Sequence, residues 1–454
     1  FPISPGEIDH LRAEQPGVAQ AAVVVGKTPQ GDKRLVGYVV PAPDTAAADA
    51  GAQVDEWRDL YDDTYADPGD AELGEDFRGW NSSYTGEPIP LDEMREWQDA
   101  AVTRILRFAP RRILEIGVGS GLLLGRIADR VDEYWGTDIS APVVARVRAQ
   151  ADRAGHGDRV QLLARPADDV SGLPAGRFDT VVINSVVQYF PDTGYLDRVL
   201  RRAMELLAPD GRIVVGDVRN ATTRQLMHTA IQRAAHPHAS DEELRTLVTR
   251  ELLAERELVI APEWFTEWAA EHSAAVDIRL KPGRAHNELT RHRYEIVLHK
   301  RPADVLDLTG IPAVPWTGRL GDLTPRAEGP VRVTGIPNAR LTGEAALTAA
   351  AGLLDRTPPP GTPVDPEDLV RHIEGHGGEA VLTWSGEDAR CYDAVLLPEP
   401  RQVSNSYVPG GPPGRPRANA PVLARSIGPL LGELSAALGG RLPGYMGPPA
   451  PVPG

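Results

Sequence analysis

The stretch Glu115-Ile116-Gly117-Val118-Gly119-Ser120-Gly121 decides the fold class of this 454-residue chain. It lies between an apolar segment that predicts a strand, Arg112–Ile116, and a segment that predicts a helix, Leu122–Val131. Glycines at such a junction allow a tight turn and a close approach to a ligand, and the helix N-terminus points its amides at that ligand. The stretch therefore predicts a ligand site at the start of a βαβ unit.

Strands and helices alternate around this glycine turn. Strand patterns recur downstream with longer helical patterns between most of them, which predicts an α/β fold with a doubly wound, mostly parallel sheet. Only a turn-like segment, Pro282 to Arg293, separates the last two strands, which predicts an antiparallel edge. The other predicted strands are Tyr134–Thr137, Val160–Leu163, Asp179–Ile183, Arg212–Gly216, Val276–Leu280 and Tyr294–Leu298, and the other helices are Pro142–Ala154 and Tyr195–Leu207.

Asp138 ends the second predicted strand, where a carboxylate can accept hydrogen bonds from both hydroxyls of a ribose. The glycine spacing is G-x-G-x-G, whereas a dinucleotide fingerprint would place its third glycine where Leu122 stands. The pattern favours an adenosine ligand without a pyrophosphate and disfavours a nicotinamide oxidoreductase. The competing interpretation is a glycine-rich turn beside a solvated aspartate.

The composition narrows the class of protein. Lys and Arg number 48 against 64 Asp and Glu, and the formal net charge of −16 argues against nucleic acid or an anionic membrane as the main partner. Cys391 is the single cysteine, so we expect no intrachain disulfide, and we expect no metal. No apolar run approaches the roughly 20 residues that span a bilayer. We expect a cytoplasmic protein, and the start at Phe1 without a signal region suggests a piece of a longer chain.

The segment Phe178–Pro191, FDTVVINSVVQYFP, and the glycine turn together resemble class I S-adenosylmethionine-dependent methyltransferases. Within this class, the resemblance is more specific to the methyltransferase domains embedded in nonribosomal peptide synthetases. It is supported by the blocks FRGWNSSYTG at Phe77–Gly86, VGDVR at Val215–Arg219 and HNELTRHRY at His286–Tyr294. The resemblance implies that a methyl group passes from S-adenosylmethionine to the α-amine of an aminoacyl thioester on a carrier domain. The alternatives are O-, S- or C-methylation of the same residue, and a non-catalytic insert that docks the carrier.

Both ends of the chain resemble the small C-terminal subdomain of adenylation domains. The opening part is Ser4–Asp9 with strands at Val23–Val25 and Leu35–Val40, and the closing part is a helix at Ile427–Leu438 followed by Arg441–Pro449. The methyltransferase is therefore expected to be inserted within that subdomain, with linkers at Pro41–Gly51 and Val408–Pro421. The expected domains are residues 1–41 and 420–454 as the two parts of the adenylation subdomain, 52–300 as the methyltransferase, and 301–407 as a small α/β appendage.

The large adenylation subdomain and the Asn-Gly-Lys motif of the family do not occur in these residues. The resemblance therefore implies that this fragment does not activate an amino acid. It also implies three partners: an aminoacyl-loaded carrier domain, the large adenylation subdomain and, through that subdomain, an MbtH-like protein.

Candidate catalytic residues follow three predicted strands. Asn184, Gln188 and Tyr189 stand at and just beyond the fourth strand and could align an amine. Asp217 follows the fifth strand, with Arg219 as its expected salt-bridge partner. The block between the last two strands adds two candidate bases, His286 and Glu288.

The cofactor residues expected from the resemblance include a lid. Trp80 and Tyr84 would fold over the cofactor with an aromatic face toward the sulfonium, or would instead fix the N-terminal helices on the sheet as a hydrophobic staple. Asp168 would bind the adenine amino group, or lie in a solvated turn. The remaining expected cofactor residues are Glu115, Gly117, Gly119, Gly121, Asp138, Ile139, Ala167, Asn184 and Ser185.

Overall fold

The computed structural model describes residues 18–27, 33–41, 43–64, 71–355, 357–410 and 416–422. Within these residues, no helix is both long enough and apolar enough to cross a membrane. The predicted opening segment at Ser4–Asp9, the closing helix Ile427–Leu438 and the segment Arg441–Pro449 lie outside the described residues. The insertion into an adenylation subdomain therefore stays a prediction.

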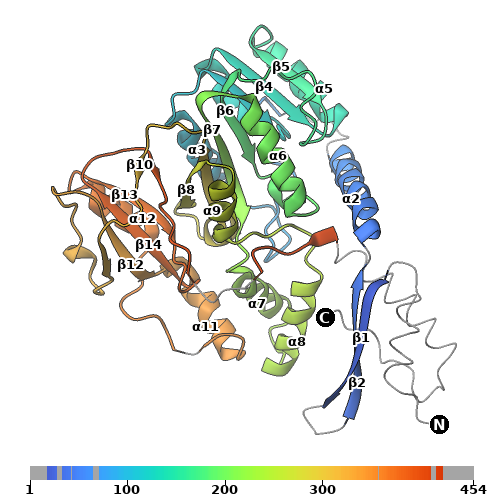
Figure 1. Cartoon of the computed structure of the whole chain (residues 1–454), viewed down its shortest axis with the longest axis vertical. Helices are drawn as coiled ribbons and strands as arrows, with labels where there is room; N and C mark the ends of the chain where they lie inside the picture. The colour runs from blue at the N-terminus through green and yellow to red at the C-terminus, as the bar shows by residue number, and fades with distance from the viewer. Residues whose placement is uncertain are drawn as a thin grey trace, which may run out of the picture.

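A seven-stranded sheet forms the centre of the molecule (Figure 1). Its strand order is β5-β4-β3-β6-β7-β9-β8; the first five strands are parallel, and β9 is antiparallel to both of its neighbours. The order reverses between β3 and β6, the kind of switch point at which open α/β sheets bind ligands. The predicted doubly wound sheet and its antiparallel edge are confirmed. The strands are β3 (Arg112–Ile116), β4 (Glu133–Asp138), β5 (Val160–Ala164), β6 (Phe178–Asn184), β7 (Leu207–Arg219), β8 (Ala275–Leu280) and β9 (Arg293–His299).

Helices cover both faces of this sheet because its strands are apolar on both sides. Ile113 and Val182 pack with the helices of one face, whereas their neighbours Leu114 and Val181 pack with those of the other face. The first face carries α3 (Leu91–Leu106), α4 (Leu124–Ile127) and α5 (Ala141–Arg153), and the second carries α6 (Thr193–Leu206) and α9 (Pro262–Glu271). The remaining helices of this part are α7 (Arg224–Ala235), α8 (Asp241–Leu253) and α10 (Glu288–His292), with short 3-10 turns η1 (Ala128–Arg130) and η2 (Val187–Tyr189).

The predicted appendage is a second, four-stranded sheet of order β11-β12-β14-β13 (Figure 1). Its residues Trp384 and Tyr392 belong to the same buried apolar cluster as Ile278 and Leu280 of β8, so the appendage and the central sheet share one core. The elements are β10 (Leu306–Asp307), β11 (Ala313–Pro315), η3 (Leu320–Asp322), β12 (Val331–Pro337), η4 (Ala339–Leu341), α11 (Thr342–Ala350), α12 (Pro366–Glu374), β13 (Glu379–Trp384), β14 (Cys391–Leu397) and β15 (Val403–Ser404).

The first described segment is an antiparallel hairpin of β1 (Val18–Lys27) and β2 (Lys33–Pro41), which confirms the two predicted strands. The predicted linker at Pro41–Gly51 is wrong, since α2 (Pro43–Thr64) begins there. The physical reason is that alanine has the highest helix propensity and that a proline is well placed in the first turn of a helix. The second predicted linker, Val408–Pro421, contacts the methyltransferase part in its described residues. The amide of Ala261 donates to the carbonyl oxygen of Arg417 at 2.7 Å.

Buried charges connect α3 with the edge strands β8 and β9. Arg104 lies 2.9 Å from Asp277 and 3.8 Å from Glu295, and Arg279 lies 2.8 Å from Asp277. Burial opposes ionisation of Asp277, but the two guanidinium groups lower its pKa to about 2. These pairs hold α3 on the edge of the sheet that packs against the appendage.

Replacing Asp277 with alanine should destabilise the protein by about 3–5 kcal/mol, because it leaves two buried guanidinium groups without their nearest counter-charge. The matched control is Asp132→Ala, which removes an ion pair with Arg111 in which both side chains are largely exposed. That change should cost less than about 1 kcal/mol. Urea unfolding of both variants measures the difference, and equal losses would contradict the importance of the buried pairs.

Candidate functional site

The glycine turn joins β3 to α4 as predicted. Its three glycines all have positive φ, 82° at Gly117, 49° at Gly119 and 81° at Gly121. A Cβ at Gly117 would lie 2.3 Å from a methyl of Val186, and one at Gly121 would lie 2.9 Å from Leu73. A Cβ at Gly119 would meet no atom within 4 Å. Gly117 and Gly121 are therefore required by packing, whereas Gly119 faces open space.

Asp138 lies beside this open space at the end of β4. One of its carboxylate oxygens accepts from the amide of Gly119 at 2.9 Å and the other from the amide of Ser140 at 3.0 Å. Burial raises the pKa of Asp138, and these amides oppose the rise. The Ser140 hydroxyl in turn donates to Asp62 of α2. A bare backbone beside an oriented carboxylate fits the ribose of S-adenosylmethionine, so the residues present are compatible with this cofactor.

Asn184 and Ser185 stand at the carboxyl end of β6, next to the same turn. A Cβ at Gly216 of β7 would lie 1.9 Å from the amide oxygen of Asn184, so Gly216 makes room for that side chain. Ser185 has a φ of 57°. Its hydroxyl donates to a carboxylate oxygen of Asp217 at 2.7 Å. The ends of β6 and β7 are therefore tied together by side chains.

Asp217 is fully buried and has a φ of 67°. Its carboxylate lies 2.7 Å from Arg293 and 3.2 Å from Lys281. Burial opposes ionisation, yet these two cations lower the pKa of Asp217 to about 2. The predicted salt bridge with Arg219 is wrong, because Arg219 pairs with Glu255 and Glu257.

The role predicted for Asp217 is also corrected. A carboxylate that is fully buried and held by two cations cannot touch a substrate and does not take up a proton in the physiological pH range. Its contact with the end of β6 is the hydrogen bond from the Ser185 hydroxyl. Sequence reasoning missed Lys281 and Arg293 as partners, although Arg293 belongs to the block that the resemblance singled out.

Gln188 and Tyr189 follow Ser185 in the short turn η2. Gln188 is buried, and its amide nitrogen donates to the carbonyl oxygen of Ser185 at 3.0 Å. The ring of Tyr189 packs against Trp57 of α2, with 4.5 Å between ring centroids. Helix α2 thus contacts residues that follow two different strands, Ser140 after β4 and Tyr189 after β6. The sequence offered no signal for Trp57, because its segment lacked any matching motif.

The two aromatic residues predicted to form a lid are held by contacts within the protein, and their contact with a cofactor stays a prediction. Trp80 packs against Trp97, with 4.5 Å between ring centroids, in a cluster that includes Leu122. The hydroxyl of Tyr84 donates to Glu344 of the appendage at 2.7 Å. The competing interpretation of a staple therefore describes Trp80, while Tyr84 bonds an element far along the chain.

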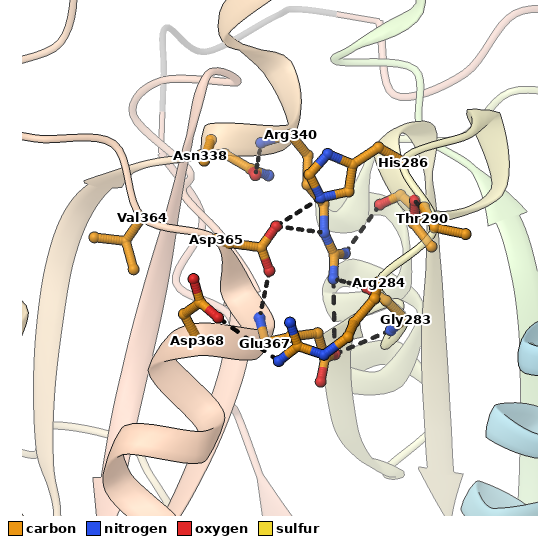
Figure 2. Close-up of polar contacts among 12 residues, drawn as sticks. Gly283, Arg284, His286, Thr290, Asn338, Arg340, Val364, Asp365, Glu367 and Asp368 are labelled. Carbon is orange, nitrogen blue, oxygen red and sulfur yellow. Dashed lines mark hydrogen bonds and ion pairs between the residues drawn. The ribbon is translucent and has the colours of Figure 1, made fainter.

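The two candidate bases between β8 and β9 are held by other contacts. Glu288 is buried and accepts from the amide of Ser83 at 2.5 Å. His286 lies 2.7 Å from Asp365 of the appendage, as Figure 2 shows. The structure thus brings neither side chain to Asn184, and both are explained by positions in the interface with neighbouring segments.

The remaining predicted cofactor residues lie at the ends of β3, β4 and β5. Glu115 is buried, and the hydroxyl of Tyr134 donates to it at 2.6 Å. Asp168 accepts from the hydroxyl of Tyr195 at 3.0 Å, beside Ala167 after β5. Ile139 follows Asp138 directly. Their contacts with a cofactor stay predictions.

Comparison with known proteins agrees with this arrangement. Residues 114–213 match the family described as a methyltransferase domain. The chain is 45% identical over its full length to 6% of CymA, described as a probable non-canonical nonribosomal peptide synthetase, of Salinispora arenicola (strain CNS-205). It is 33% identical, over 98% of its length, to 12% of the chondramide synthase CmdD of Chondromyces crocatus. The chain therefore spans a small part of the relatives that it matches.

Solved structures are more distant. The geranyl diphosphate C-methyltransferase of Streptomyces coelicolor A3(2) shares 12% identity with a TM-score of 0.38, over 55% of this chain and 98% of its own.

Replacing Gly119 with valine should weaken binding of S-adenosylmethionine at least about tenfold, because the branched side chain would fill the space beside Asp138. The matched control is Gly155→Val, since Gly155 also has positive φ and open space around a Cβ. Both variants should lose about 1–2 kcal/mol of stability from the left-handed backbone. Calorimetric titration separates them, and equal affinities would place the cofactor elsewhere.

Glu115→Gln should flatten the dependence of stability on pH. Burial raises the pKa of Glu115 to about 8, even though the Tyr134 hydroxyl lowers it. Between its ordinary pKa of about 4.3 and this value, the folded protein holds a proton that the unfolded chain has lost, so stability falls as pH rises. Glutamine cannot titrate. Chemical unfolding from pH 5 to 8 should show a smaller decline for the variant, and an unchanged decline would contradict the assignment.

Proposed function

Because the chain contains a class I S-adenosylmethionine-dependent methyltransferase domain and is similar along its length to segments of nonribosomal peptide synthetases, we propose that it N-methylates an aminoacyl group. The acceptor is the α-amine of an amino acid held as a thioester on a carrier domain. The observation that carries the proposal is the full-length similarity to synthetase segments, joined to polar side chains at the carboxyl ends of β6 and β7.

S-adenosylmethionine, when bound, supplies an electrophilic methyl group on a sulfonium. In the transfer, the lone pair of the amine forms the new N–C bond while the C–S bond breaks and its electrons stay on sulfur. The methylated ammonium then loses a proton to water or buffer. Positioning and exclusion of water are the contributions that such an in-line displacement needs from the protein.

The chain's own residues are arranged for that task. Asp138 and the bare backbone at Gly119 would hold the ribose. Asn184, at the end of β6, places its side chain in the space left by Gly216 of β7. Its amide nitrogen donates to the hydroxyl of Ser185 at 3.2 Å. Because ionised Asp217 fixes Ser185, the side chains of Asn184 and Ser185 present neutral polar groups in fixed positions. Such groups can orient a neutral amine without trapping it as an ammonium ion.

The proposal requires the amine to be deprotonated before it attacks. The rate should therefore rise with pH until the bound ammonium has lost its proton, and then level off. Asp217 is not the group that titrates in this profile, because its pKa lies near 2.

Asn184→Ala should lower turnover by about tenfold or more while the affinity for S-adenosylmethionine changes less than about threefold, because the lost contact acts on alignment in the transition state. The matched control is Asn405→Ala, which removes an asparagine whose amide donates to Asp307 in the appendage. The assay uses carrier domains loaded with a panel of aminoacyl groups, and fragmentation mass spectrometry locates the new methyl group. A methyl on a side chain or on the α-carbon, with the amine untouched, would refute N-methylation.

A further inference from the structure

The appendage inserts one arginine into the connection between β8 and β9. Arg340, in η4, has a fully buried side chain. Its guanidinium donates to the carbonyl oxygens of Lys281 at 2.8 Å, Gly283 at 2.5 Å and Thr290 at 3.3 Å. Figure 2 shows this guanidinium between the appendage and the connection. Because Lys281 and Thr290 stand near opposite ends of the connection, a single side chain joins both ends.

Two carboxylates of the appendage hold the same connection from the same side. Glu367 accepts from the amide of Gly283 at 2.9 Å, and Asp365 lies 2.7 Å from the ring nitrogen of His286. The Arg340 guanidinium lies between them, 3.7 Å from Glu367 and 4.0 Å from Asp365. Asp365 is itself fixed as the N-cap of α12. The connection is therefore held at its main chain and at one side chain by rigid elements of the appendage.

Two sets of contacts link the connection to the residues around the glycine turn and Ser185. The ammonium of Lys281 pairs with Asp217, and Asp217 accepts a hydrogen bond from the hydroxyl of Ser185. Leu289 packs in the cluster that contains Leu122, the residue that follows the glycine turn. A shift of the connection would therefore move Asp217 on one side and the glycine turn on the other.

An arginine suits this position for a physical reason. Its planar fork offers five N–H donors, enough to serve three carbonyl oxygens that lie in different directions. Burying the guanidinium costs free energy, and that desolvation lowers the pKa of Arg340 although the two carboxylates oppose it. An apolar residue could fill the volume but could not bind main-chain carbonyls.

We propose that Arg340 is a positioning residue for methyl transfer: it fixes the β8–β9 connection and thereby sets Lys281, Asp217 and Ser185 at the cleft. The part of this inference that concerns turnover rests on the proposed function, whereas the fixing of the connection does not. The appendage then has a role in the reaction, although it touches neither Asn184 nor Asp138 through Arg340.

The test compares Arg340→Met with Arg332→Met. Arg332 is an equally buried arginine of the appendage that donates to the carbonyl oxygens of Ser406 and Asn405, away from the connection. Hydrogen exchange followed by mass spectrometry on the full chain without acceptor should show residues 283–292 exchanging about tenfold faster in Arg340→Met only. Calorimetry should show binding of S-adenosylhomocysteine within about threefold of the unaltered chain.

Turnover is measured as release of S-adenosylhomocysteine with carriers that bear the same aminoacyl panel. Arg340→Met should lower kcat about tenfold or more and leave KM for S-adenosylmethionine within about threefold, since the cofactor half of the site is intact. Arg340→Lys keeps the charge but not the fork, so it should lose about threefold or more in kcat with a folded chain. This second variant decides the matter if methionine prevents folding.

The inference is overturned if the Arg340 variants turn over normally, if Arg332→Met loses as much turnover, or if exchange of residues 283–292 is unchanged. Failure of the proposed function looks different. A methyl group found on an atom other than the amine would refute N-methylation, yet release of S-adenosylhomocysteine would still test Arg340. Where no acceptor of the panel is methylated, the exchange experiment alone supports or overturns the fixing of the connection.

Discussion

The ionic interaction of the buried Asp217 carboxylate with Lys281 and Arg293 is the one on which the rest of the site depends. Asp217 sits at the end of β7 in a left-handed backbone conformation, where only nearby cations and donors can keep it ionised. Lys281, Arg293 and Ser185 provide them. Both cations come from the ends of the connection between β8 and β9, so the antiparallel edge of the sheet is part of the site and not only a cover for it. Residues in strained backbone conformations gather at functional sites, and here two of them bond each other.

This dependence explains why the appendage shares a core with the central sheet. The appendage is joined to the rest of the chain by polar contacts of buried side chains. Arg340 donates to main-chain carbonyl oxygens of the β8–β9 connection, and Glu344 accepts a hydrogen bond from the Tyr84 hydroxyl. The similarity of the whole chain, appendage included, to a synthetase segment fits a functional unit larger than residues 114–213.

The sequence predicted those parts of the site that depend on local pattern. The apolar runs predicted the strands, and the spacing of the glycine turn and Asp138 predicted that the two lie together, as the hydrogen bond from the Gly119 amide to Asp138 confirms. The salt bridge predicted between Asp217 and Arg219 does not form. Strand β7 carries an irregularity between Val215 and Val218, where Asp217 has a φ of 67°, so the regular alternation of side chains is broken there. The contacts of Tyr84 and of Trp57 join segments more than a hundred residues apart, and no short motif reports them. The alanine-rich start of α2 suits a linker and a helix alike, so composition alone could not decide.

We propose that methyl transfer takes place at the carboxyl ends of β3, β4, β6 and β7, between the glycine turn and Ser185. A crystal structure of the chain with S-adenosylhomocysteine tests this most directly. We predict both ribose hydroxyls within hydrogen-bond distance of Asp138, the ligand backbone against Gly119, and the sulfur on the side of Asn184 and Ser185. A nucleoside bound elsewhere, or a ribose turned away from Asp138, would contradict the account.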